Sequence, residues 1–418
     1  MESTETFVLS PSSRTLTQRS TPSTRSLANA KRLRMPATQD KPWLASKHPG
    51  ERWLTIIPLT GILLAIAVSG VICYLGIATI PKNTYCLVLE DNFSTLNTSI
   101  WSHEIQLGGF GNGEFEWTTD SSNNSYVSNG ILHIVPTLTE DSIGVDNLLN
   151  GYTLNLTECT GTAWSDCIRT SNATNGTIIN PVQSARLTTR NSVSIKRGKV
   201  EVVAKLPKGN WLWPAIWLMP KNSVYGQWPA SGEIDIAESR GNSRTYSPSG
   251  NNVFDSTLHW GPSSDLDRWY LTTKSYSNQH SDYTQDYHTF GLEWTDAYIK
   301  TWIDSPLRQN LYVEFKQDFW SRGYFPLSFE NGTATFNIWG STGSPSTPFD
   351  QDFYLILDLG VGGTNGWFPD SLNKPWVDSS PNAQLEFYKD KANWLSTWGA
   401  GEASGLSVKS VKMWQLCN

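Results

Sequence analysis

The chain has 418 residues, a net charge of −6 at neutral pH and 17 % charged residues, and this balance gives no reason to expect a nucleic-acid partner. It holds 20 Trp, 15 Tyr and 15 Phe together with 32 Gly and 22 Pro. Aromatic side chains fill cores or stack on flat ligand faces, and frequent Gly and Pro are typical of a turn-rich β protein rather than a helical one.

The first eighty residues divide into a polar tail and an apolar run. Residues 1–52 are rich in Ser, Thr, Lys and Arg, and we expect a disordered tail there. Residues 53–81 contain no charged side chain, and an apolar run of roughly 20 residues can cross a bilayer as a helix. We therefore predict one transmembrane helix over 53–80. A cleaved signal peptide is the competing interpretation, but the run is long and lies behind a long polar segment.

The charges flanking this run predict its orientation. Residues 1–52 carry nine Lys and Arg against four acids, and basic flanks stay cytoplasmic. We therefore expect a single-pass type II membrane protein with residues 81–418 extracellular or lumenal and the lipid bilayer as a partner. The N-glycosylation sequons agree, because all of them lie after the run. They are at Asn92, Asn97, Asn123, Asn155, Asn172, Asn175 and Asn331.

The cysteines also indicate an oxidising compartment for the large C-terminal part. Four of the five lie beyond the apolar run, and Cys73 falls inside it. Cys159 and Cys167 enclose a short loop and are expected to pair. That leaves Cys86 with Cys417, a bond that would join the start of the domain to its end and requires neighbouring termini.

The C-terminal part contains short alternating runs punctuated by Gly, Asn, Asp and Pro. "KVEVVAKL" (199–206), "TFGLEW" (289–294) and "AYIKTWID" (297–304) alternate as strands do. Thr295-Asp296 joins the last two and predicts a hairpin. "FYLILDLGVGG" (353–363) is continuously apolar and predicts a central strand. Many short strands in this length predict a β-sandwich with long loops.

Three acids, Glu233, Asp235 and Glu238, lie among apolar residues in "WPASGEIDIAESRGN" (228–242). Glu233 and Asp235 are two apart and share a strand face, but Glu238 is five from Glu233 and would face away in a regular strand. A β-bulge inserts one residue and restores the facing of the residues after it. We predict a bulge between Asp235 and Glu238.

Acids on a strand usually face solvent, and like charges placed close together are destabilising. Here Ile234 and Ile236 alternate with the acids, and the preceding strand "WLWPAIWLMP" (211–220) is strongly aromatic. Acids that only faced solvent at a sheet edge would not need apolar and aromatic neighbours. Acids that have such neighbours are candidates for a functional site.

The spacing of the two glutamates predicts a reaction class. With the bulge, their effective offset is four residues, or roughly 13 Å of strand. Each side chain spans roughly 3–4 Å, which leaves the carboxyls about 5–6 Å apart. Retaining glycosidases need roughly 5–5.5 Å, whereas inverting enzymes need about 6.5–9.5 Å to fit a water. The spacing therefore favours retention through a covalent intermediate, although it does not say which glutamate is the nucleophile.

The acid-bearing segment 232–238, "GEIDIAE", resembles the active-site strand of glycoside hydrolase family 16. Its extra residue is that of the laminarinase-like, endo-β-1,3-glucanase branch, and the similarity spans most of 87–416. The resemblance implies an all-β fold, a concanavalin A-like β-jelly-roll sandwich with a concave substrate cleft. Five further blocks occur in the family's order: "GNGEFEWTT" (111–119), "WLWPAIWLMP" (211–220), "STLHWG" (256–261), "YHTFGLEWT" (287–295) and "GVGGTNGWFPD" (360–370).

The resemblance also implies roles. Glu233 would be the nucleophile, Glu238 the general acid/base and Asp235 the assisting acid. Five further residues match family positions around the substrate: Trp213, Trp217, Trp228, His259 and Asn112. Indole rings would stack on pyranose faces, although Trp213 and Trp217 could equally be core residues and His259 could be structural.

No metal or other cofactor is expected. Many family members bind calcium through an Asp in the last strand, but "SVKSVKMW" (407–414) places Lys409 about there. A lysine cannot ligate a hard cation.

The leading hypothesis is a membrane-anchored retaining enzyme on β-1,3-linked glucan that hydrolyses or transglycosylates it. A tail, one span and a family 16 domain also resemble fungal type II membrane proteins of β-glucan assembly, which favours cell-wall metabolism over digestion. The second hypothesis is a non-catalytic β-glucan-binding, lectin-like protein, although such proteins often lack the catalytic acids that this chain keeps. A structural membrane glycoprotein is a third and weakly supported hypothesis.

Overall fold

The computed structural model describes residues 49–78, 83–326, 328, 332, 334–371 and 373–417. Nearly all of the tail predicted over 1–52, and the sequon at Asn331, lie outside the described residues. The chain forms two compact units that divide after Pro81.

In the described part of the first unit, residues 49–78, lies the helix α1 (Glu51–Ala78), whose 28 residues include Pro58. It begins two residues before the predicted span and therefore includes Arg52. The helix is long and apolar enough to cross a membrane, and none of its residues is buried. By length and composition it fits the predicted span.

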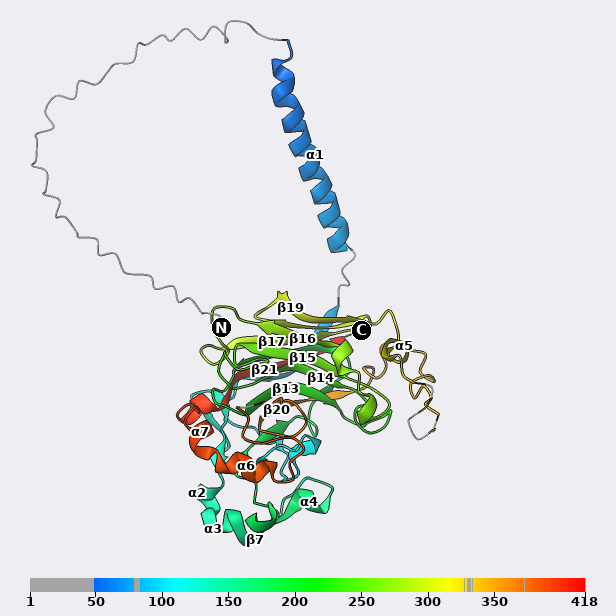
Figure 1. Ribbon diagram of the computed structural model, residues 1–418. Helices are drawn as coiled ribbons and strands as arrows, with labels where there is room; N and C mark the ends of the chain where they lie inside the picture. The colour runs from blue at the N-terminus through cyan, green and yellow to red at the C-terminus, as the bar shows by residue number, and fades with distance from the viewer. Residues whose placement is uncertain are drawn as a thin grey trace, which may run out of the picture. The chain divides into compact units, whose positions relative to one another are not determined.

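The second unit is a sandwich of two antiparallel sheets, which confirms the predicted all-β jelly-roll fold (Figure 1). Sheet A has the order β19-β18-β17-β12-β21-β5-β4, with β1 also on β21, and sheet B has the order β16-β15-β14-β13-β20-β10-β2, with β11 also on β20. In Figure 1 the labels β16, β15, β14, β13 and β20 succeed one another down the picture in the order of sheet B.

The strands of sheet A are β19 (Ser305–Glu314), β18 (Tyr298–Ile303), β17 (His288–Trp294), β12 (Gly198–Lys205), β21 (Leu406–Cys417), β5 (Ile131–Ile134), β4 (Ser125–Ser128) and β1 (Thr84–Asp91). Those of sheet B are β16 (Thr273–Ser277), β15 (Val253–His259), β14 (Glu233–Ser239), β13 (Leu212–Pro220), β20 (Phe353–Val361), β10 (Arg186–Thr188), β2 (Ser102–His103) and β11 (Ser194–Ile195).

The predicted strands are confirmed to within one or two residues, and their burial matches their patterns. The alternating β12 is buried at every second residue, whereas the continuously apolar β20 is buried throughout and lies inside sheet B. Strands β17 and β18 form the predicted hairpin. Aromatic pairs join the two sheets, with Phe254 of β15 at 5.2 Å from Phe290 of β17 and Trp294 of β17 at 5.4 Å from Phe353 of β20.

Both predicted disulfides are confirmed. Cys86 of β1 pairs with Cys417 of β21, two strands that run side by side, and Cys159 pairs with Cys167. The first bond therefore fastens the start of the domain to its last strand.

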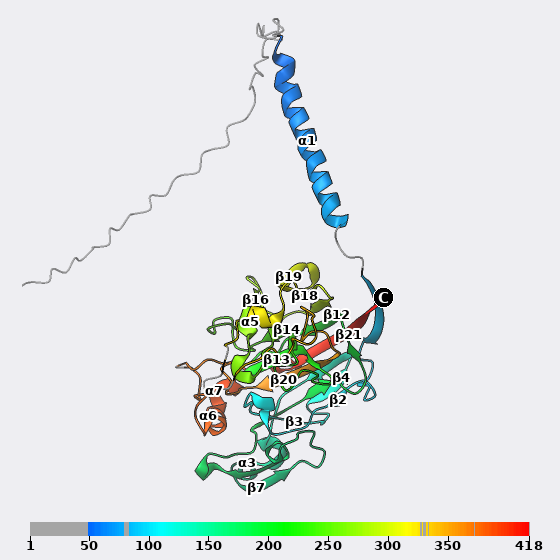
Figure 2. The same cartoon turned by 90° about the vertical axis from the view of Figure 1, so that its right-hand side faces the viewer.

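Smaller elements lie outside the sandwich, and Figures 1 and 2 both place α3 beside β7. The strands are β3 (Glu116–Thr118), β9 (Val182–Ser184), β6 (Thr137–Leu138), β7 (Asn150–Asn155) and β8 (Ile168–Asn172), of which β3 and β9 are parallel. The helices are α2 (Glu140–Ile143), α3 (Val145–Leu149), α4 (Trp164–Cys167), α5 (Phe319–Gly323), α6 (Ala383–Lys389), α7 (Lys391–Leu395), η2 (Gly109–Gly111), η3 (Ala173–Asn175), η4 (Ser264–Leu266), η5 (Trp269–Leu271) and η6 (Gly401–Ser404).

Candidate active site

The predicted bulge lies in β14. Asp235 pairs with Thr257 and Glu238 with Asp255, so three steps along β14 match two along β15. On the other side, β13 pairs with Asp235 and with the residue before Glu238 and skips Ile236. The extra residue therefore turns the Glu238 side chain back to the sheet face that carries Glu233 and Asp235, as predicted.

The register places all three acids on one face of sheet B. Residues directly opposite each other on neighbouring strands point to the same side. Asp235 lies opposite Trp217, and Glu238 opposite Ala215, both on β13, while Glu233 lies opposite His259 on β15. The opposite face carries fully buried residues such as Ile234, whose cross-strand partners are also apolar.

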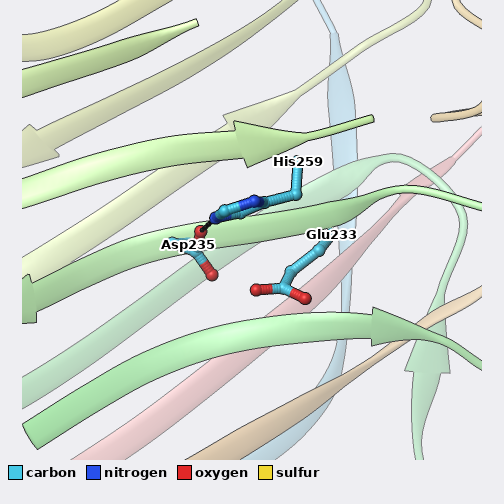
Figure 3. Close-up of side chains that lie close together, drawn as sticks. All are labelled: Glu233, Asp235 and His259. Atoms are coloured by element: carbon cyan, nitrogen blue, oxygen red, sulfur yellow. Dashed lines mark ion pairs between the residues drawn. The ribbon is translucent and has the colours of Figure 1, made fainter. Parts of the chain in front are cut away.

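Glu233 and Asp235 leave β14 two residues apart, and Figure 3 shows their carboxyl groups near each other with the His259 ring beside Asp235. The indole Nε1 of Trp228 donates to Oε2 of Glu233 at 2.7 Å. Asp235 is 1 % exposed. Burial, together with the charges of Glu233 and Glu238, raises the pKa of Asp235 well above its usual range. Asp235 therefore keeps a proton that it can donate to Glu233.

His259 is oriented by an acid on each side. Its Nδ1 lies 2.5 Å from Oδ2 of Asp267, and its Nε2 lies 3.4 Å from Oδ2 of Asp235. Burial disfavours the charged ring, but the carboxylates of Glu233 and Asp267 outweigh it and raise the pKa of His259 to about 9. His259 is therefore an imidazolium at neutral pH, a fixed positive charge among the acids.

Glu238 has the environment of a proton donor. Burial raises its pKa to about 7, and the charge of Glu233 adds to this effect. The His259 charge and a hydrogen bond from Trp213 Nε1 to Glu238 Oε1, 3.0 Å long, act in the opposite direction. A carboxyl group with a pKa near 7 exchanges its proton readily at neutral pH.

Trp213 is fixed by a stack of three side chains. Its ring lies 4.9 Å from that of Trp367 at an interplanar angle of 12°. The guanidinium of Arg240 lies 3.8 Å from the Trp367 ring and donates twice to the Trp367 carbonyl. Trp367 therefore covers one face of the Trp213 ring, while the indole N–H of Trp213 points to Glu238. Stacking of Trp213 on a sugar remains a prediction.

Trp217 takes part in a second charged group on the same sheet face. Its Nε1 donates to Oδ1 of Asp358 at 2.9 Å, and the Arg186 guanidinium lies 4.6 Å from its ring. Arg186 also forms an ion pair of 2.5 Å with Glu104. Burial raises the pKa of Asp358 to about 7, although Arg186 acts against this. The interactions of Trp217 are thus largely with protein groups, and its sugar-binding role stays a prediction.

Asn112 joins two loops in the described structure. Its Nδ2 donates to Glu114 at 2.8 Å, and its Oδ1 accepts from Asn365 at 3.1 Å. Its carbonyl accepts from the backbone N–H of Thr364. A contact of Asn112 with a glucan therefore remains a prediction.

Asp267 and Trp269, which lie beside His259, carried no sequence signal, whereas Trp228 was predicted to lie around the substrate. Asp267 fixes His259, and its Oδ1 also accepts from the backbone of Trp269, which begins η5. Trp228, Trp269 and Tyr270 are 42 %, 46 % and 55 % exposed. The Trp228 and Trp269 rings lie 5.6 and 6.5 Å from the His259 ring. Exposed aromatic rings of this kind are suited to stacking on an apolar ligand face.

Among the described residues, Glu233, Asp235 and His259 are also the group whose ligand atoms lie close enough for a metal ion, within 4.8 Å of one another. Lys409, at the position considered for calcium, lies 5.0 Å from the Tyr287 ring.

The two-sheet sandwich and the acids on one bulged strand define a β-jelly roll of the laminarinase type. The sequence profile "Glycosyl hydrolases family 16" matches residues 137–350, a range that contains all three acids. The chain belongs to this family.

Named relatives fall into two kinds. The chain is 40 % identical over 344 residues to a "Beta-1,3-glucan-binding protein" of Penaeus monodon, covering 79 % of this chain and 90 % of that one. It is 31 % identical over 291 residues to "Glucan endo-1,3-beta-glucosidase A1" of Niallia circulans, covering 66 % of this chain and 34 % of that one. The structure of an endo-β-1,3-glucanase from Pyrococcus furiosus has the same fold, with a TM-score of 0.50, 23 % identity, and 81 % and 97 % of the chains covered.

Proposed function

We propose that this chain is a retaining glycoside hydrolase that acts on β-1,3-linked glucan, by hydrolysis, transglycosylation or both. The observation that carries the proposal is the bulge of β14, which presents Glu233, Asp235 and Glu238 on one sheet face. Their environments differ, since Glu238 has a pKa of about 7 while Glu233 accepts a hydrogen bond from Trp228. Two acids with separate tasks are what a double displacement requires.

In the first step, a carboxylate oxygen of Glu233 attacks the anomeric carbon. Glu238 gives its proton to the glycosidic oxygen as the bond between that oxygen and the anomeric carbon breaks. The reducing-end fragment leaves, and the sugar remains attached to Glu233 as an ester. The protonated Asp235 donates a hydrogen bond to Glu233, which holds the nucleophile in place.

In the second step, Glu238, now a carboxylate, takes a proton from water or from a sugar hydroxyl. The oxygen of that acceptor attacks the anomeric carbon, the ester bond breaks, and Glu233 is restored. Formation of the ester removes the charge of Glu233, which is one of the causes that raise the pKa of Glu238. Glu238 thereby becomes more acidic when it has to act as a base.

The membrane placement is part of the proposal. The apolar helix α1 and the basic residues before it support an anchor with the catalytic domain outside the cytosol or in a lumen. Six of the seven sequon asparagines, all except Asn331, lie in the described part of the domain, and their side chains are exposed. Their glycosylation and a role in cell-wall glucan metabolism belong to the same proposal.

The second candidate is a glucan-binding protein without turnover, which the 40 % identity to the Penaeus monodon protein favours. Both candidates share β-glucan as the partner. They differ in what the acids do, because a binding face has no use for a proton donor beside a nucleophile.

One experiment separates the candidates. Residues 83–418, which contain the separate β-sandwich unit, are incubated with laminari-oligosaccharides at several pH values, with Glu233→Gln as the control. Shorter products alone mean hydrolysis, and longer together with shorter products mean transglycosylation. Binding without turnover at any pH would leave the second candidate, and an inverted anomer in the first product would refute retention.

A further inference from the structure

A buried polar cluster lies between the two sheets, directly behind the bulge of β14. It consists of Ser256 of β15, Thr301 of β18 and Asn310 of β19, which are 0 %, 0 % and 8 % exposed. Ser256 is two residues from both Phe254 and Leu258, which are buried on the same face of β15. The cluster therefore stands in a layer that is otherwise apolar.

Ser256 connects the bulge to the opposite sheet. Its Oγ donates to the carbonyl oxygen of Ile236 at 2.6 Å. The same Oγ accepts from Thr301 Oγ1 at 2.9 Å and from Asn310 Nδ2 at 3.0 Å. The proton and both lone pairs of the Ser256 hydroxyl are thus used. Because Thr301 and Asn310 belong to sheet A, the bulge of sheet B is tied across the core.

Two further bonds fix the cluster itself. Asn310 Nδ2 also donates to the carbonyl of Lys274 at 3.0 Å, and the backbone N–H of Leu311 donates to Thr301 Oγ1 at 3.1 Å. Asn310 Oδ1 has no hydrogen-bond partner among the described residues. Buried polar groups are costly unless they are fully paired, so apolar side chains would fill this space more cheaply. Packing alone therefore does not account for the cluster.

The carbonyl that Ser256 holds belongs to the residue that makes the bulge. The register skips Ile236 on β13 and leaves Ser256 of β15 between the pairs of Asp235 and Glu238. We propose that Ser256, supported by Thr301 and Asn310, is a positioning residue that fixes the bulge and thereby holds the Glu238 carboxyl at Trp213 and Glu233. Its kinetic consequence rests on the proposed function.

The central variant is Ser256→Ala in residues 83–418. A misplaced acid affects the chemical step more than substrate binding. We expect kcat on laminari-oligosaccharides to fall about 10- to 100-fold with KM changed less than about threefold. The basic limb of the kcat/KM profile moves to lower pH, because a loosened Glu238 becomes better solvated.

Matched variants separate positioning from general destabilisation. Ser184 is also fully buried, and its Oγ donates to a strand carbonyl, that of Leu359, at the same 2.6 Å. Ser184→Ala is expected to lower the midpoint of thermal unfolding much as Ser256→Ala does, but to keep the wild-type kcat and pH profile. Thr301→Val removes the donor to Ser256 at constant shape and is expected to lower kcat, whereas Thr301→Ser keeps the hydroxyl and retains activity.

A readout without turnover keeps this proposal separate from the proposed function. The stability gained at pH 8 on replacing Glu238 by Gln is measured in the wild-type, Ser184→Ala, Ser256→Ala and Thr301→Val backgrounds. We expect the gain to shrink by about half or more in the last two. If it shrinks although no variant turns over glucan, the positioning stands and the proposed function fails. If Ser256→Ala and Thr301→Val match Ser184→Ala in kcat, in the pH limb and in this gain, the positioning is refuted.

Discussion

Replacing Glu238 by Gln is expected to stabilise the domain at neutral and alkaline pH. The folded environment raises the pKa of Glu238 from 4.5 to about 7, chiefly through burial. Between these values the folded carboxyl keeps a proton that the unfolded chain has lost. The free energy of unfolding of the wild type therefore falls as the pH rises through this window.

The magnitude is set by the width of the window. A shift of about 2.5 pH units at 1.36 kcal/mol per unit costs the wild type about 3 kcal/mol at pH 8 and almost nothing at pH 4. A glutamine is neutral at every pH, has nearly the same shape, and can still accept from Trp213 Nε1, which now donates to Glu238 at 3.0 Å. The variant is thus expected to match the wild type at pH 4 and to exceed it by about 3 kcal/mol at pH 8.

The assay is urea unfolding of residues 83–418 at integral pH values from 4 to 8, without reductant so that both disulfides stay closed. Glu201→Gln on β12 of sheet A is the control, because it removes a carboxylate from the other sheet. A difference between Glu238→Gln and wild type that stays constant from pH 4 to 8 would refute the raised pKa, and with it the assignment of Glu238 as proton donor.

Three further predictions concern the surroundings of Glu238 and the termini. Trp213→Phe removes a hydrogen bond that lowers the pKa of Glu238, so the basic limb of kcat/KM is expected to move up by about 1 pH unit; an unmoved limb contradicts this. Asp267→Asn removes a carboxylate that raises the pKa of His259, and the NMR titration midpoint of that imidazole is expected to drop from about 9 by at least roughly 1 unit. Replacing both Cys86 and Cys417 by Ser removes a disulfide that joins residues 331 apart, and is expected to lower the free energy of unfolding by about 2–5 kcal/mol. The same replacement at Cys159 and Cys167, which are 8 residues apart, is expected to cost less. Equal losses would show that loop size does not control the effect.

The bulge could be predicted because residues an even number of positions apart on a regular strand lie on the same face, and residues an odd number apart lie on opposite faces. Glu238 at an odd offset from Glu233 either leaves the site or requires one extra residue, and the structure has that residue. The strands near the site could be predicted for a similar reason, since alternation along β12 and continuous apolarity along β20 report burial directly. The disulfides could be predicted because few pairings are available.

The supports of the site could not be predicted in this way. Asp267 reaches His259 from a loop, and Ser256 reaches Thr301 from the other sheet. These contacts depend on how loops close and how sheets stack, and local periodicity carries neither kind of information. The elements between 140 and 180 were missed because their short helices and strands are too brief to show a period.

The electrostatics of Glu238 bear on the choice between enzyme and binding protein. A face that only binds glucan needs aromatic rings and hydrogen-bonding groups, and exposed rings such as Trp228 supply them without a carboxyl of raised pKa. A carboxyl whose ionisation costs about 3 kcal/mol of folding free energy above pH 7 lowers the stability of the domain without benefit unless its proton takes part in catalysis. The two candidates therefore differ in what Glu238→Gln does to turnover, while both allow glucan binding to persist. In an enzyme, Glu238→Gln abolishes product formation and raises stability. A stabilised variant that binds laminari-oligosaccharides with unchanged affinity and releases no product would therefore link the stability cost of the half-buried Glu238 to catalysis.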